Sequence, residues 1–347
     1  MKRKIKKRWI VLCVFCVLIF GCFIWFQIYT HMGTGADIPE EKAVISKEDT
    51  PVVYFTSDIS PESLVAIYEV LGREATGNIG VKINTGESEN SNYLRPELIG
   101  DLVQSINGTI VESNTAYGGS RIETAMHMQI AADHGFTVIA DVDILDSEGT
   151  MSLPVEGGFH LSEDIVGSHF ADYDFYVIIS HFKGHQMGGF GGALKNISIG
   201  FASPGGKNLI HTAGGSDSSS FTVGTIFGML GFGGAAQDAF LESMADASKA
   251  VTDYMGDNIL YINVMNRLSV DCDCSANPTE PDMHDIGILA SFDPVALDQA
   301  CVDMIYSAED GASVAERIET RNGEHTLEAA EALGIGYRTY IQVNIDE

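Results

Sequence analysis

The sequence predicts an α/β fold: a mostly parallel sheet flanked by helices, in two Rossmann-like halves, preceded by one N-terminal transmembrane helix. Three observations predict it. Short apolar runs alternate with helix-like stretches along the body of the chain. Ser, Pro and Gly stand where those helices would begin and end. An uncharged run of bilayer length follows a basic N-terminus.

The N-terminal segment predicts a membrane anchor. "MKRKIKKRW" carries six basic residues and no acidic one, and the run from Trp9 to Tyr29 carries no charge. As a helix this run is long enough to span a bilayer, and the preceding cations keep that end in the cytoplasm. We therefore expect a basic end plus signal-anchor at 1–30, a polar tether at 31–50 and an extracytoplasmic α/β domain at 51–347.

Two alternatives also place the body outside the cytoplasm. "IFGC", ending at Cys22, is similar to a lipobox, which would make the chain a lipoprotein. Ordinary cleavage of a signal peptide is the other alternative, although no small-x-small site is evident. We favour the uncleaved anchor because the apolar run is longer than the core of an ordinary signal peptide. The expected location is the cell membrane, with a single pass.

The first half of the body alternates strand-like and helix-like segments. Ser60 and Pro61 mark where one helix begins, and Gly72 marks where it ends. Strands are expected at 51–56, 78–84, 108–113 and 136–142, and helices at 60–72, 95–107 and 121–135. Strands that follow helices at short intervals are typical of a parallel sheet covered by helices.

The second half continues the pattern. The apolar run at 174–180 is typical of a strand buried on both faces, and Asp293 with Pro294 predicts the start of a helix. Further strands are expected at 258–266, 285–291 and 337–345, and helices at 233–256, 293–308 and 325–334. Residues 201–235 are rich in Gly and Ser and predict a long loop.

The charge of the body excludes one class of partner. Residues 31–347 hold 14 of the 20 Lys and Arg and all 48 Asp and Glu, so their net charge is 14 − 48 = −34. Such a surface repels nucleic acid, and no nucleic-acid partner is expected. A local cluster of cations is therefore more informative in this chain than in most.

Polar residues cluster where the predicted strands end. In parallel α/β sheets, ligands sit beyond the carboxyl ends of the strands. We therefore predict a pocket for a small anionic ligand or cofactor there. Its predicted ligand-binding residues are Lys82, Asn84, Asn114, Tyr117, Arg121, His181, Lys183, His185 and Lys195.

The glycine loop after the strand at 174–180 has two interpretations. Gly188 to Gly192 could point successive N–H groups at an anion, and a helix starting at 193 could add its N-terminus. Alternatively, these glycines allow close packing of one chain segment on another. The loop matches neither nucleotide-binding glycine fingerprint.

Three cysteines lie in the body. In "DCDC", two thiols one residue apart with flanking carboxylates can bind a soft metal ion, so Asp271, Cys272 and Cys274 are predicted metal ligands. A disulfide within the pair, or two free thiols, are the alternatives. Cys301 falls on a predicted helix, where core packing is expected.

Several blocks resemble one family. "VKINTGE", "NTAYGGSR", "HFKGHQMGGFGGALKNISIG", "DCDC" and "DIGILASFDPVALDQA" look like the family called domain of unknown function 362, over about residues 51–342. Relatives described as iron–sulfur centre proteins carry ferredoxin-type cysteine inserts after the glycine loop. Residues 201–235 of this chain contain no Cys, so a ferredoxin-type [4Fe–4S] cluster is not expected.

The resemblance implies no settled activity, and the sequence leaves open whether the protein is an enzyme. The expected function is that of a membrane-anchored extracytoplasmic protein with an anionic-ligand or cofactor pocket and a redox or metal-binding element at the cysteine pair. The alternative is a non-catalytic solute- or cofactor-binding protein that acts with a membrane partner.

Overall fold

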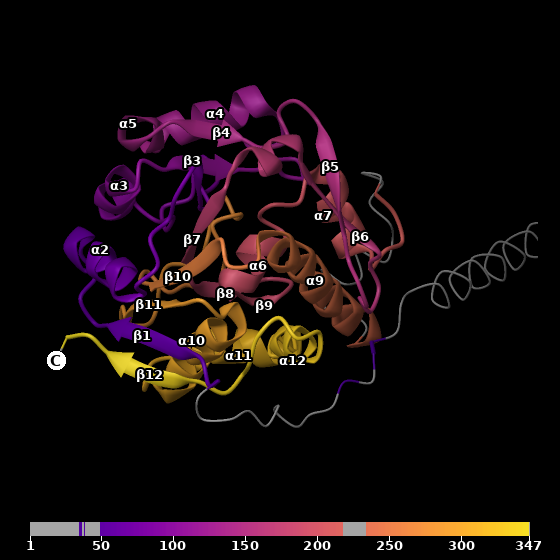
Figure 1. Ribbon diagram of the computed structural model, residues 1–347. Helices are drawn as coiled ribbons and strands as arrows, with labels where there is room; N and C mark the ends of the chain where they lie inside the picture. Colours follow the sequence, from indigo (N-terminus) through magenta and orange to yellow (C-terminus); the bar gives the residue numbers. More distant parts are fainter. Residues whose placement is uncertain (1–34, 37, 39–48, 218–233, 347) are drawn as a thin grey trace, which may run out of the picture.

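A computed structural model of the protein describes residues 35, 36, 38, 49–217 and 234–346 (Figure 1). Within these residues, no helix combines the length and the apolar character that a bilayer span requires. The predicted anchor from Trp9 to Tyr29 lies outside the described residues, as does most of the predicted tether.

One eight-stranded sheet forms the centre of the body, in the order β12-β1-β11-β10-β7-β2-β3-β4 (Figure 1). The strands are β12 (Ile341–Asn344), β1 (Val52–Thr56), β11 (Gly287–Ser291), β10 (Ile259–Met265), β7 (Phe175–His181), β2 (Ile79–Lys82), β3 (Thr109–Glu112) and β4 (Val142–Ile144). Only β11 runs antiparallel to its two neighbours, and the other five pairings are parallel. The prediction of a mostly parallel sheet is confirmed, and its two halves form one continuous sheet.

Strand β7 separates two hydrophobic cores. All seven of its residues are buried. Phe175, Val177 and Ile179 pack in one core, and Tyr176 and Ile178 pack in the other, because successive side chains of a strand point to opposite faces. The continuous apolar run at 174–180 thus gives the doubly buried strand that was predicted.

Four helices accompany the first half: α2 (Pro61–Val70), α3 (Pro96–Ser105), α4 (Thr124–Asp133) and α5 (Phe136–Ile139). Ser60 caps α2 as predicted, because its side chain accepts a hydrogen bond from the Ser63 N–H. The predicted strand at 136–142 is wrong. Gly135 adopts a φ of 90°, which ends α4 and lets a second helical turn begin. Of that turn only Phe136 is buried, so no apolar face holds it in the sheet.

The second half contains α6 (Ala193–Ser198), α7 (Pro204–His211), α9 (Gly234–Met255), α10 (Pro294–Ser307), α11 (Ala312–Thr320) and α12 (His325–Ala332). Asp293 caps α10 through the N–H groups of Val295 and Ala296, as predicted. The predicted loop at 201–235 is wrong in part, because α7 occupies residues within it. Ser203 caps that helix and Pro204 begins it, which outweighs the two glycines that follow.

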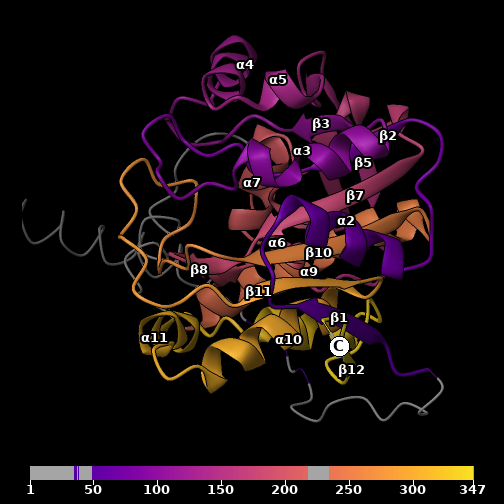
Figure 2. The ribbon, with the colours of Figure 1, turned by 90° about the vertical axis from the view of Figure 1, so that its left-hand side faces the viewer.

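Two short hairpins and a 3-10 turn complete the fold: β5 (Thr150–Pro154) with β6 (Glu163–Gly167), β8 (Lys183–His185) with β9 (Gly189–Gly191), and η1 (Ser168–Asp172). The predicted glycine loop is therefore the β8–β9 hairpin. It lies beyond the end of β7, beside the loop that follows β10 (Figure 2). The Gly184 N–H donates to the Ser269 carbonyl at 2.8 Å, which joins the two segments.

Candidate functional site

A cavity of about 300 Å³ lies beyond the carboxyl ends of β2, β3 and β7. Eight of the nine predicted ligand-binding residues line it: Lys82, Asn84, Tyr117, Arg121, His181, Lys183, His185 and Lys195. They come from three separate stretches of the chain. The structure thus brings together polar residues that the sequence could place only at the ends of individual strands.

Asn114 is the exception. Its side-chain N–H groups donate to Asp146 at 3.1 Å and to Thr124 at 3.0 Å, and its backbone N–H donates to Asp146 at 2.8 Å. Asn114 therefore orders the loop after β3 and does not line the cavity.

One wall of the cavity is an ion-pair network between the loops after β2 and β3. Lys82 Nζ lies 2.8 Å from Glu112, and both side chains are buried. Arg121 contacts Glu112 at 3.3 Å and Glu87 at 3.0 Å, and it donates to Asn84 Oδ1 at 2.8 Å. Burial alone would raise the pKa of Glu112, but Lys82 together with His127 and Arg121 lowers it to about 2. Glu112 is therefore an anion that holds two cations at the cavity wall.

A second wall joins the end of β7 to the "DCDC" loop. The buried carboxylate of Asp273 lies 2.5 Å from Lys183 Nζ and 3.1 Å from His181 Nδ1. Burial opposes ionisation of Asp273, but Lys183 and His181 hold its pKa well below the ordinary value. Sequence reasoning missed Asp273. The repeat in "DCDC" was the available signal, since either of its aspartates could face the pocket.

Asp271, the predicted metal ligand, has different partners. Its carboxylate accepts hydrogen bonds from the N–H and hydroxyl of Thr279 and lies 3.4 Å from Arg317. These contacts close a turn at the surface. Asp271 is thus separated from the two cysteines with which the sequence had grouped it, and it does not line the cavity.

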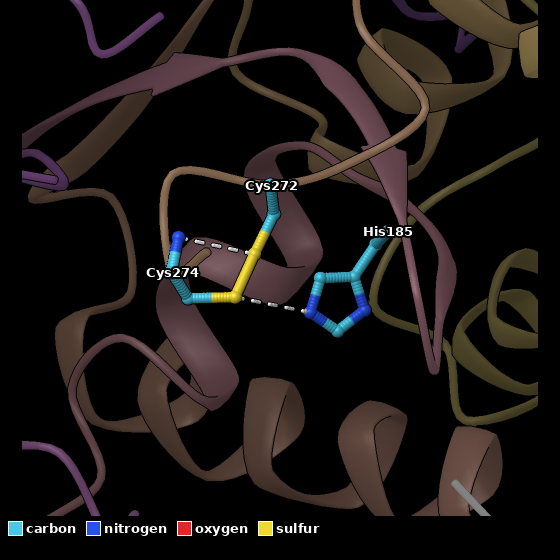
Figure 3. A group of neighbouring side chains, drawn as sticks. All are labelled: His185, Cys272 and Cys274. Carbon is cyan, nitrogen blue, oxygen red and sulfur yellow. Dashed lines mark hydrogen bonds between the residues drawn. A yellow bond between two sulfur atoms is a disulfide. The ribbon is translucent and has the colours of Figure 1, made fainter. Parts of the chain in front are cut away.

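Cys272 and Cys274 form a disulfide, which is one of the alternatives left open above (Figure 3). Cys274 lines the cavity, and its sulfur lies 4.0 Å from His185 Nε2. Donor atoms of His185, Cys272 and Cys274 lie within 4.8 Å of one another, as ligands of one metal ion would. Cys301 is buried in the core, as expected.

The disulfide-bonded form of this group does not fit a metal ion. Thiolates bind metals, and both sulfurs here are bonded to each other. His185 Nδ1 accepts the Gly188 N–H at 2.8 Å, so the neutral ring carries its proton on Nε2, the atom that faces Cys274. Burial and then Lys195 lower the pKa of His185 well below its usual value, which keeps the ring neutral.

The backbone of the glycine segment is already occupied. Asp298, on α10, accepts the N–H groups of Ala193 at 2.7 Å and Leu194 at 2.9 Å. The predicted anion at the start of this helix is therefore a carboxylate of the protein itself. A Cβ atom at Gly192 would lie 2.2 Å from Asp298 Oδ1, so the glycine is needed for this close approach. The packing interpretation of the segment is the correct one for these amides.

Two lysines complete the cavity. Lys207, on α7, donates to the Ala202 carbonyl, and burial lowers its pKa to about 8. Lys195, on α6, is half-buried, and burial together with Lys183 lowers its pKa to about 7. Sequence reasoning missed Lys207, together with the neighbouring lining residue His211, because it placed both in a loop.

The cavity carries positive charge inside an acidic protein. Among the described residues, five cationic side chains line it and three carboxylates contact them, which leaves a formal balance of two positive charges when all five cations are protonated. The cations are Lys82, Arg121, Lys183, Lys195 and Lys207, and the carboxylates are Glu87, Glu112 and Asp273. A site of this charge attracts anions.

The chain belongs to the family described as domain of unknown function (DUF362), whose model matches residues 79–303. The matched range includes both walls of the cavity and the disulfide. No curated protein matches the chain.

Two solved structures resemble the fold. One is the lactate racemase apoprotein from Thermoanaerobacterium thermosaccharolyticum, with 15% identity and a TM-score of 0.39 over 67% of this chain and 55% of that one. The other is a protein from Thermotoga maritima, with 14% identity and a TM-score of 0.43 over 70% of this chain and 57% of that one. The chain spans little more than half of each protein. Neither similarity bears on activity.

Proposed function

We propose that the protein is a membrane-anchored, extracytoplasmic protein whose body binds a small anion. The supporting observation is the cavity of about 300 Å³ with its excess of positive charge. This volume is at the lower end of the range typical of ligand pockets, so it suits a small carboxylate or phosphate compound better than a nucleotide. The residues proposed to contact the anion are Lys183, Lys207 and Arg121.

Binding is tested by calorimetry on the full-length chain in detergent, with pyruvate and inorganic phosphate as probes. Lys207→Gln should weaken binding about tenfold, because one charge-assisted hydrogen bond is worth about 1.5 kcal/mol. Lys249→Gln is the matched control, since it removes the same charge from a surface ion pair with Asp253, outside the cavity. If neither probe binds, or if both variants weaken binding equally, the proposal fails.

The membrane anchor is proposed from the basic end and the apolar run, Trp9 to Tyr29. In intact cells, the full-length chain should fractionate with membranes, and protease added outside should digest its body. Cys22→Ala separates the two kinds of anchor. Membrane attachment that survives this change supports the helix, and attachment that is lost supports the lipoprotein alternative.

A redox-linked version of this function, or a metal-linked one after reduction of the disulfide, is supported by the cysteine pair beside the cavity, because Cys274 lines the space in which the anion would lie. The alternative is a non-catalytic protein that holds a solute or cofactor for a membrane partner. The thiols discriminate between the two. Cys272→Ser and Cys274→Ser should leave anion affinity intact in the non-catalytic case and change it in the redox case.

A further inference from the structure

Lys195 differs from the other cations of the cavity in its partners. Carboxylates lie 2.8 Å from Lys82, 3.0 Å from Arg121 and 2.5 Å from Lys183. Lys207 donates to a backbone carbonyl. For the Lys195 ammonium group, the described part of the chain supplies neither a hydrogen bond nor an ion pair. The cavity thus contains one amine to which no described carboxylate or carbonyl bonds directly.

Packing rather than charge positions this amine. Asp298 caps the start of α6, and Lys195 follows two residues after the first helical residue. Its aliphatic stem crosses Gly191, where a Cβ atom would lie 3.2 Å from Lys195 Cδ. Next to it, Asn196 Nδ2 donates to Ser180 Oγ at 3.1 Å, which fixes the helix against the end of β7. The amine is therefore directed into the cavity by a stem that the hairpin glycine accommodates.

The surroundings make the neutral form of the amine accessible near pH 7. Burial has the largest effect, and the positive charges of Lys183, Lys82 and Arg121 add to it, whereas Asp273 acts in the opposite direction. Together they lower the pKa of Lys195 to about 7. Burial and neighbouring cations are the two conditions under which lysines act as nucleophiles in proteins.

We infer that Lys195 is a nucleophile that forms an imine with a small carbonyl compound bearing a carboxylate or phosphate group. This inference rests on the proposed function, because Lys183, Lys207 and Arg121 must hold the anionic group while the amine of Lys195 reaches the carbonyl. The proposed function is the binding of an anion, and this inference adds imine formation to it.

The step balances without another reactant. The Lys195 nitrogen forms a bond to the carbonyl carbon, and the carbonyl electron pair moves to oxygen, which takes up the proton that the nitrogen releases. The resulting carbinolamine loses its hydroxyl group and the remaining nitrogen proton as water, which leaves a C=N bond. No electrons are gained or lost, and one water leaves for each imine.

Reductive trapping tests the inference on the full-length chain in detergent. The chain is incubated with pyruvate or dihydroxyacetone phosphate, treated with sodium borohydride, and analysed by intact mass and peptide mapping. One reduced adduct per chain is expected, on Lys195. Lys195→Arg keeps the charge and should abolish the adduct. Lys249→Arg should retain it.

Calorimetry on the same samples, before borohydride is added, separates two kinds of failure. Probe binding without an adduct at Lys195 overturns the imine and leaves the anion pocket standing. An adduct on Lys207, or on scattered lysines in both variants, also overturns it. If neither probe binds, the proposed function and the imine fail together. A Gly191→Ala variant that binds the probe but forms the adduct more slowly would support the positioning of the stem.

Discussion

The Lys183 ammonium group lies 2.5 Å from the Asp273 carboxylate, although 90 residues separate the two in the chain. This contact joins the β8–β9 hairpin to the loop that carries the disulfide. Both side chains are buried, so each depends on the other for charge compensation. The contact therefore fixes the relative positions of the cavity and the cysteine pair.

Asp273→Asn should destabilise the protein by about 3 kcal/mol, because it leaves the buried Lys183 without a counter-charge. Asp271→Asn, two residues away, is the matched control. Its side chain is less deeply buried than that of Asp273, its contact with Arg317 is long at 3.4 Å, and an Asn keeps an acceptor for Thr279, so the expected change is under about 1 kcal/mol. Chemical denaturation of both variants measures the difference in the free energy of unfolding. Equal effects would mean that the ion pair has no special role.

Glu112 should make stability depend on pH in the acid range. Its pKa falls from 4.5 to about 2 on folding, so the unfolded chain takes up the proton first as the pH is lowered. This contribution to stability is complete above about pH 4.5 and is lost as the pH falls towards about 2. Denaturation curves across that range should show a steeper loss for the unaltered chain than for Glu112→Gln. Parallel losses would contradict the assignment.

Gly192→Ala should destabilise the body by about 2 kcal/mol, because the new Cβ atom would displace the Asp298 carboxylate from the amides of Ala193 and Leu194. Gly118→Ala is the control, since no atom of the described residues lies within 4 Å of its added Cβ. Thermal unfolding compares the two. A Gly192→Ala protein as stable as the Gly118→Ala protein would show that the carboxylate does not cap α6 in solution.

Metal binding at the cysteine pair should require reduction. The disulfide leaves no thiolate, whereas a dithiol reductant would free Cys272 and Cys274 beside His185. Elemental analysis after exposure to Zn²⁺ should find one ion per reduced chain and none per oxidised chain. Cys272→Ser should abolish uptake, and Cys301→Ser should retain it because Cys301 lies in the core. Uptake by the oxidised chain would contradict this account.

Much of the fold was predictable because its signals are local. Ser60 and Asp293 cap helices through N–H groups two or three residues away, and the run at 174–180 needs only its own apolar side chains to be recognised as a buried strand. The strand predicted at 136–142 is wrong because its β-branched residues lie on an exposed surface. Val138 is 83% exposed, and a β-branched residue favours a strand chiefly when it packs against a core.

The sequence could predict that the residues of the candidate site follow the ends of strands, but not which of them contact one another. Lys82, Arg121, Lys183 and Lys195 line one cavity because the segments that carry them follow parallel strands, which end at one edge of a sheet. The sequence could not show whether Asp271 or Asp273 faces the pocket, since both flank Cys272. Asp273 is the one that is buried against Lys183, and 90 residues of chain separate these two.

The sequence by itself determined the α/β pattern, most helix ends, the acidic surface and the short list of cations, because each depends on neighbouring residues or on composition. Only the tertiary structure decided which carboxylate pairs with which cation, that the Asp298 carboxylate caps the start of α6, and that no described residue bonds to the Lys195 ammonium group. These outcomes depend on contacts between residues far apart in the chain, and only the folded chain brings their charges within a few ångströms of one another.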